Sequence, residues 1–278
     1  GLLETPIALT GTLSTWRVAD ALAEWVIDQP GNEAVQSVNP VVGECNDGSL
    51  SDVRRRSVGR EQLRAALAEA SSGPVAEGCV GGGTGTRCLG FKGGIGTASR
   101  RLPKHFGGWT VGVLVQTNFG GELTIAGVPV GRAFVDLPFG IRLGEHGDGS
   151  CMIVVATDAP LDARQLARLA RRTPMGLARV GSFATHGSGD YAIAFTANLS
   201  CRLRRDASGM HRVEILRDEE LSPLLLAVVE ATEEAVLNSL FAATTTSGRD
   251  GRVVEALPVD AVLKLLAERG ALAKPSGE

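Results

Sequence analysis

The feature that most limits how this chain can fold is a pair of short runs of almost entirely apolar residues. Residues 109–116 read WTVGVLVQ, and residues 151–157 read CMIVVAT. Polar and apolar residues do not alternate along either run, which predicts strands that are buried on both faces. A sheet built from such strands must be covered on each side by other elements.

Amphipathic segments are predicted to provide this cover. Helices are expected at residues 15–28, 60–71, 161–172, 222–243 and 259–269, and further strands at residues 133–137 and 191–197. In the helix at 161–172, Asp162 and Gln165 form a capping pair, and in the helix at 222–243 Leu226 and Val229 are expected to face the core. No linker rich in Pro, Gly or Ser separates two cores. We therefore expect one domain over residues 1–278, of the α/β or α+β class.

Composition and charge argue against several classes of partner. The formal net charge is −3, whereas surfaces that bind nucleic acid or membranes are usually basic. No apolar run approaches the roughly 20 residues that span a bilayer. The five cysteines include no C-x-x-C pair, and no His, Cys or carboxylate cluster has metal-ligand spacing. We expect no metal, no cofactor, and no nucleic-acid or membrane partner. We expect the cysteines to be reduced thiols.

Reduced thiols favour a cytoplasmic location. The sequence opens on Gly1 rather than methionine, so a leader could precede it and a periplasmic location stays open.

Glycines are concentrated in residues 78–100, which read GCVGGGTGTRCLGFKGGIGTASR. A P-loop would require lysine where Phe91 stands, and a dinucleotide-binding fingerprint would require a third glycine where Cys88 stands. Nucleotide binding is therefore not expected. Glycine permits positive φ angles and close backbone approach, so the segment is predicted either to wall a pocket with bare amides or to serve packing alone.

Ser150 stands between a polar loop, HGDG, and the apolar run that follows it. On local grounds it is a turn residue before a buried strand. A catalytic serine would need a base, and no G-x-S-x-G motif pairs it with His146 or His186. If the Gly149–Ser150 bond were cut, the new α-amine, with a pKa of about 7.7–8.0, could remove the hydroxyl proton itself. The residues alone leave both interpretations open.

Several long motifs together resemble one enzyme family. GDGSCMIVVATDAPL, NPVVGECNDG, GTGTRCLGFKGGIGTASR, WTVGVLVQTNFG and HGSGDYAIAFT are similar, in this order, to segments of the L-aminopeptidase/D-esterase family. These DmpA-type enzymes include the β-peptidyl aminopeptidases, and the resemblance runs from about Leu3 to Pro258. It implies a four-layer αββα sandwich, similar to the N-terminal-nucleophile (Ntn) hydrolases but differently connected. It also implies that the chain cuts itself.

The resemblance assigns roles to individual residues. Cleavage between Gly149 and Ser150 would give an α chain of residues 1–149 and a β chain of residues 150–278. Ser150 would then be the nucleophile, with its own amine as the base, and Asn118 would supply the oxyanion-hole amide. Ser188 and Asp190 would orient the nucleophile and its ammonium group.

The resemblance also implies a substrate-binding pair. Glu44 would receive the free amino group of the substrate, and Asn46 stands near a position where some relatives use a tyrosine as a second oxyanion donor. Without the resemblance, each of these polar residues would be assigned to a turn or a loop cap.

The expected function is a self-processing serine aminopeptidase or amidase that acts on short peptides, amides or esters with a free amine. Relatives suggest a tetramer of αβ units. Two alternatives stay open. One is an acyltransferase of the ornithine acetyltransferase type. The other is an inactive, peptide-binding homologue, because relatives carry a segment before the LETPI motif that this chain lacks.

Overall fold

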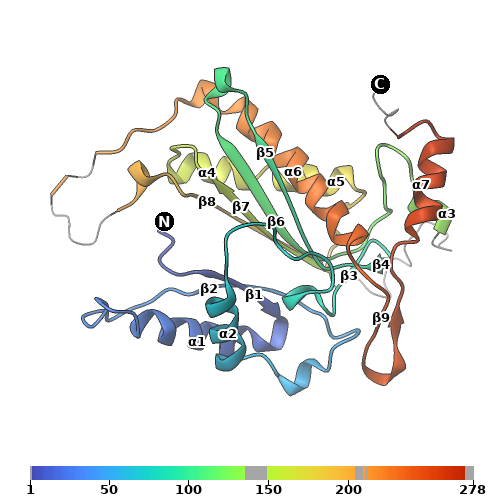
Figure 1. The fold of residues 1–278 in the computed structure, drawn as a ribbon, viewed down its shortest axis with the longest axis horizontal. Helices are drawn as coiled ribbons and strands as arrows, with labels where there is room; N and C mark the ends of the chain where they lie inside the picture. The colour runs from blue at the N-terminus through green and yellow to red at the C-terminus, as the bar shows by residue number, and fades with distance from the viewer. Residues whose placement is uncertain (1, 135–148, 204–208, 211, 273–278) are drawn as a thin grey trace.

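The structure is a computed structural model that describes residues 2–134, 149–203, 209–210 and 212–272. Its centre is a four-stranded sheet in the order β5–β6–β7–β8 (Figure 1). The strands are β5 (Ile95–Arg101), β6 (Thr110–Asn118), β7 (Ser150–Thr157) and β8 (Gly189–Thr196). β6 pairs antiparallel with both β5 and β7, and β8 runs parallel to β7. The two apolar runs of the sequence are thus the two inner strands, as predicted.

A helical layer covers one face of this sheet. It contains α4 (Ala163–Ala170), α5 (Thr173–Arg179) and the long α6 (Ser222–Phe241), which packs on β5 and β6. The main core lies between the sheet and these helices. It is built from alternate residues of the inner strands, such as Val113, Val115, Ile153 and Val155, together with the inner side of α6. The α4–α5 segment connects the parallel strands β7 and β8.

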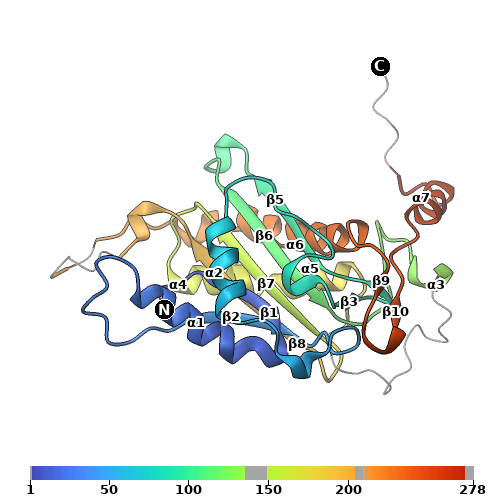
Figure 2. The same cartoon turned by 60° about the horizontal axis from the view of Figure 1, so that its bottom comes forward.

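A second, smaller sheet lies against the other face. Strands β1 (Ile7–Gly11) and β2 (Val41–Cys45) are parallel, and β2 packs on β7 and β6. Helices α1 (Thr15–Ile27) and α2 (Arg60–Glu69) lie outside β1 and β2, around a small separate cluster that includes Val18, Leu22 and Leu63. Figures 1 and 2 show the resulting order of helices, sheet, sheet and helices.

Shorter elements complete the described part of the chain. The glycine-rich segment forms a tight hairpin of β3 (Arg87–Cys88) and β4 (Phe91–Lys92) before it enters β5. After α6 come β9 (Thr246–Ser247), β10 (Val253–Val254) and α7 (Val259–Glu268). None of the helices in the described ranges is long and apolar enough to span a membrane.

Three predictions about secondary structure need correction. The strand expected at residues 133–137 is wrong at its start, because Ala133 and Phe134 end the short helix α3 (Gly131–Phe134), and residues 135–137 lie outside the described ranges. The helix expected at 161–172 is shorter, although Asp162 and Gln165 do form its capping box. Leu226 is exposed, because α6 buries the side that carries Leu224 and Val228.

Candidate active site

Ser150 and Asn118 are directly opposite each other at one end of the inner strands. Ser150 is the first residue of β7, Asn118 is the last residue of β6, and the two are paired in the antiparallel register. Paired residues project from the same face of a sheet with Cβ atoms about 4.5–5.5 Å apart. Both residues are only 8% exposed, and the Ser150 Oγ is a buried oxygen without a hydrogen-bond partner among the described residues. A buried hydroxyl that is left unpaired is available for chemistry.

The side-chain amide of Asn118 is held in a fixed orientation. Its Oδ1 accepts a hydrogen bond from the Arg87 backbone N–H at 3.2 Å, and its Nδ2 donates to the Asn46 carbonyl at 3.1 Å. An amide nitrogen carries two hydrogens, so one donor remains for another oxygen. A preorganised donor of this kind, beside a buried hydroxyl, is what an oxyanion hole requires.

The carbonyl that precedes Ser150 is also bound. The Gly149 oxygen accepts a hydrogen bond from the backbone N–H of Gly189 at 2.8 Å, where β8 begins beside β7. This donor fixes the Gly149–Ser150 peptide. It also points at the oxygen on which negative charge would build if that carbonyl were attacked.

Ser188 and Asp190 interact with each other at the start of β8. The Ser188 hydroxyl lies 3.1 Å from both carboxylate oxygens of Asp190, to which it donates. Burial raises the pKa of the Asp190 carboxyl, and hydrogen bonds from Ser188 and the Cys151 backbone only partly oppose this. The register places Asp190 beside Cys151, one residue from Ser150. A cation that formed at Ser150 would therefore find a half-buried carboxylate nearby.

The two predicted substrate-binding residues lie on the neighbouring sheet and the turn that follows it. Asn46 touches Asn118 through its backbone carbonyl, while its own side chain accepts a hydrogen bond from Gly48 N–H. The Glu44 carboxylate accepts a hydrogen bond from the Thr12 hydroxyl. No hydrogen bond among the described residues joins Glu44 to Ser150 or Asn118, so its role stays a prediction.

Two buried residues that the sequence analysis did not single out support the site, Cys45 on the second sheet and Gln116 on the central sheet. The Sγ of Cys45 lies 3.6 Å from the Ser150 carbonyl and 3.5 Å from the Gln116 carbonyl. Burial raises the pKa of the Cys45 thiol to about 12, so it is a neutral donor. The Gln116 amide donates to the carbonyls of Thr10 and Gly82 and so ties β1 to the central sheet. In the sequence, the only signal for these two supporting roles is that Cys45 and Gln116 lie near the ends of predicted strands.

Lys92, within the glycine-rich segment, is fully buried. Its Nζ donates to the carbonyls of Gly83 at 2.9 Å and Gly93 at 2.7 Å. Lys92 pairs across the β3–β4 hairpin with Arg87, whose N–H holds Asn118. The segment therefore positions the candidate oxyanion donor, which agrees with its expected place at the wall of a site.

Histidines do not contribute to this arrangement in the described ranges. His186 and His105 are exposed, while His146 and His211 lie outside the described residues. No cluster of three or more potential metal-ligating side chains occurs within the residues that the structure describes.

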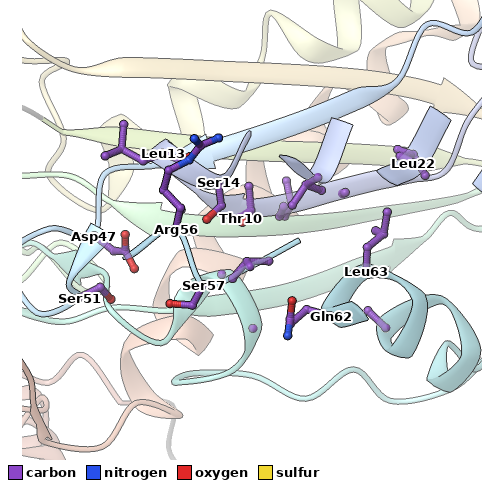
Figure 3. Close-up of a pocket in the computed structure, with 18 of the residues that line it drawn as sticks. Thr10, Leu13, Ser14, Leu22, Asp47, Ser51, Arg56, Ser57, Gln62 and Leu63 are labelled. Carbon is purple, nitrogen blue, oxygen red and sulfur yellow. The ribbon is translucent and has the colours of Figure 1, made fainter. Parts of the chain in front are cut away.

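A cavity of about 620 Å³ lies between β1, α1 and α2 (Figure 3). Apolar side chains such as Leu22 and Leu63 line one part of it, and Asp47, Ser51 and Arg56 line another. None of Ser150, Asn118, Ser188 and Asp190 lines this cavity. We therefore place the candidate active site at the ends of β6, β7 and β8.

Comparisons with known proteins identify the family of the chain. The model of peptidase family S58 matches residues 1–254. The β-peptidyl aminopeptidase BapA of Sphingosinicella microcystinivorans is 40% identical over 272 residues, which are 93% of this chain and 68% of that protein.

Two solved structures have a similar fold. The L-aminopeptidase D-Ala-esterase/amidase of Ochrobactrum anthropi, described as a prototype for the serine aminopeptidases and a new variant of the Ntn-hydrolase fold, has a TM-score of 0.86 and 38% identity. The match covers 95% of this chain and 74% of that chain. A Burkholderia sp. β-aminopeptidase has a TM-score of 0.83 and 41% identity, with 99% of this chain and 76% of that chain covered.

These matches confirm the family, the fold and the class of hydrolase that the motifs predicted, and they do not favour the acyltransferase or inactive alternatives. The chain belongs to peptidase family S58, with the Ntn-hydrolase variant of the serine aminopeptidases as its fold.

Proposed function

We propose that this chain is a self-processing serine aminopeptidase whose nucleophile is Ser150. The observation that carries the proposal is the buried Ser150 Oγ, which has no hydrogen-bond partner among the described residues and stands opposite the oriented amide of Asn118. The hydroxyl of a buried structural serine at a strand end normally forms a local hydrogen bond. Peptidase family membership supplies the reaction class.

The first reaction of the site is on its own backbone. The Ser150 hydroxyl attacks the Gly149 carbonyl carbon, and the C–N bond breaks as its nitrogen takes up a proton. This leaves Gly149 joined to Oγ as an ester. Water then hydrolyses the ester, giving a carboxylate at Gly149 and a free α-amine at Ser150. The Gly189 N–H, 2.8 Å from the attacked carbonyl oxygen, stabilises the charge that develops there.

Turnover of substrate uses the groups that cleavage creates. The Ser150 amine has an ordinary pKa near neutrality, so it can accept the hydroxyl proton as Oγ attacks the substrate carbonyl. The free Nδ2 hydrogen of Asn118 binds the oxyanion. The amine then passes its proton to the leaving group, and water releases the acyl group from Oγ. Asp190, held by Ser188, stabilises the ammonium form between these steps.

The substrates are short peptides, amides or esters with a free amino group. Support for this class comes from two similar proteins, which are named β-peptidyl aminopeptidase and L-aminopeptidase D-Ala-esterase/amidase. We assign the recognition of that amino group to Glu44 and a secondary contact to Asn46. The single domain over residues 1–278 and a tetramer of αβ units stay predictions.

The experiment compares an amino-acid p-nitroanilide with its N-acetylated form. We expect the free-amine compound alone to be hydrolysed, with an acyl group transiently found on the peptide that begins at Ser150. Ser150→Ala should abolish hydrolysis. Ser182→Ala serves as the matched control, because Ser182 lies in the segment between α5 and β8 and its hydroxyl accepts a hydrogen bond from the nearby Ala184 N–H. Equal hydrolysis of both compounds, or an active Ser150→Ala variant, would contradict the proposal.

A further inference from the structure

Lys92 carries a charge into a fully buried position, and the mechanism described above gives that charge no task. Its Nζ donates to the carbonyls of Gly83 at 2.9 Å and Gly93 at 2.7 Å. Both of these partners are neutral. A buried charge with neutral hydrogen-bond partners costs free energy that an apolar side chain of similar size does not. Packing alone therefore does not account for a lysine at this position.

One connection between Lys92 and Asn118 is the β3–β4 hairpin itself. Arg87 and Lys92 are opposite each other in this hairpin, and their backbone N–H groups point outward from it. The Arg87 N–H binds the Asn118 Oδ1 at 3.2 Å, and the Lys92 N–H binds the Glu255 carbonyl at 2.7 Å. The position of the hairpin therefore decides where the Oδ1 end of the Asn118 amide is held.

A second connection begins at the bond from Lys92 Nζ to Gly83. Gly85, two residues further on, packs against the turn that follows β2. A Cβ built at Gly85 would stand 2.8 Å from Asp47 Oδ2, so the two segments are in direct contact. Asp47 follows Asn46, whose carbonyl accepts the hydrogen bond from the amide nitrogen of Asn118 at 3.1 Å. The glycine turn at residues 83–85 thus supports the group that holds the Nδ2 end of the amide.

We infer that Lys92 is a positioning residue for the oxyanion donor, because its ammonium joins the two segments that orient the Asn118 amide. The inference rests on the proposed function, in which that amide binds the oxyanion. Arg87 N–H holds Oδ1 and the Asn46 carbonyl holds Nδ2, so one planar group is fixed at both ends. Without the ammonium, two buried carbonyls lose their donor, and the hairpin and the glycine turn are free to move relative to each other.

The consequence for catalysis follows from the short range of an oxyanion contact. Such a donor must lie about 2.7–3.1 Å from the developing negative charge. A small rotation of the Asn118 amide moves its free hydrogen out of this range, although the substrate can still bind. Lys92 is therefore expected to act on the chemical step and not on substrate affinity.

The test is a double-mutant cycle of Lys92→Met and Asn118→Ala, measured by steady-state kinetics with a free-amine p-nitroanilide. Methionine removes the ammonium and keeps an unbranched side chain. Lys92→Met alone should lower kcat about 10²-fold and leave KM nearly unchanged, the loss that a misplacement of about 1 Å produces. In the Asn118→Ala background, the same substitution should lower kcat less than about twofold, because the amide through which Lys92 acts is absent.

A role in stability alone would give a different result. Lys92→Met would then remove the same fraction of active protein in both backgrounds, and the two losses in kcat would multiply. Self-cleavage before Ser150 provides an internal check of folding, because the Gly189 N–H, and not Asn118, binds the carbonyl oxygen that is attacked there. Lys92→Met should therefore still be cut. Lys264→Met, which removes an exposed lysine on α7, is the matched control and should leave kcat unchanged.

A second variant covers the case in which Lys92→Met does not fold. Lys92→Gln keeps one neutral donor group in the slot, and its kcat should lie between those of the wild type and Lys92→Met. Multiplying losses, a loss confined to KM, an unchanged kcat in a folded variant, or failure of both variants to fold would each overturn the inference. An inactive wild-type protein, or full activity of Asn118→Ala, would instead contradict the proposed function and the inference with it.

Discussion

Asn118 and Ser150 occupy one register position on adjacent strands, and their side chains leave the same face of the sheet. This is a geometry that loops cannot easily reproduce, because ladder hydrogen bonds fix both backbones. The Asn118 amide is then oriented by two backbone groups from other segments, Arg87 N–H and Asn46 C=O. We therefore assign Asn118 to transition-state stabilisation rather than to substrate affinity.

Replacing Asn118 with alanine should lower kcat by about 10²–10³ and change KM little, as loss of a single oxyanion donor does in other enzymes. Steady-state kinetics on a free-amine nitroanilide provide the measurement. Asn198→Ala is the matched control, because Asn198 is also an asparagine beyond a strand end, where it bonds to Ser200 and Asp158. A loss confined to KM would show that Asn118 binds substrate instead.

Asp190 should show its raised pKa in the stability of the uncut chain. The folded protein holds the proton more tightly than the unfolded chain, whose carboxyl titrates near 3.8. Between that value and the higher folded pKa, the folded state binds more protons, so stability falls as pH rises. In the Ser150→Ala background, Asp190→Asn should therefore become more stable relative to its parent as pH increases from 3 to 7.

Urea denaturation at several pH values measures this difference. The Ser150→Ala background matters, because it prevents formation of the α-amine whose positive charge would favour ionised Asp190 and lower its pKa again. Glu268→Gln, on the surface of α7, is a control for the loss of one carboxylate. A stability difference that is constant with pH would contradict the account of Asp190.

At the scale of elements, the close approach of β5 to α6 depends on the absence of a side chain at Gly96. A Cβ at Gly96 would stand 1.9 Å from the Ala235 carbonyl oxygen on α6, a distance that neither backbone can accept. A Cβ built at Gly112, on the adjacent strand β6, would have no heavy atom of a neighbouring segment within 4 Å. The close approach of α6 therefore excludes a side chain at residue 96, whereas no neighbouring atom excludes one at residue 112.

Gly96→Ala should destabilise the fold by about 3 kcal/mol, at the upper end of the usual cost of overpacking, because α6 must move off the sheet. Gly112→Ala should change the free energy of unfolding by less than about 1 kcal/mol. Chemical denaturation of both variants compares them directly. Equal destabilisation would mean that the helical layer is less tightly seated on β5 than the structure has it.

At the scale of the whole molecule, the sequence predicts the layers of strands and helices better than the contacts between distant segments. Local patterns suffice for the inner strands and for the cap of α4, because burial on two faces and a capping box are encoded within a few residues. The long-range family motifs were needed for Asn118, Ser188 and Asp190. No local pattern distinguishes an oxyanion amide from a turn residue.

The remaining features depend on contacts between distant segments. The hydrogen bond from Gly189 to the Gly149 carbonyl, and the approach of Cys45 to Ser150, join residues far apart in the chain. Periodicity wrongly predicts an inward Leu226, because it gives the width of an apolar face but not its centre, which the sheet beneath α6 decides. The strand prediction is wrong at residues 133–134, because a four-residue helix leaves almost no periodic signal in the sequence.

The central claim is that the bond before Ser150 is cut by the hydroxyl that follows it, and the intact mass of the purified, folded protein tests this most directly. The account predicts two associated chains, the second with Ser150 at its N-terminus, and a single uncut chain for Ser150→Ala. A wild-type protein that hydrolyses amino-acid amides while it remains one covalent chain would contradict the account.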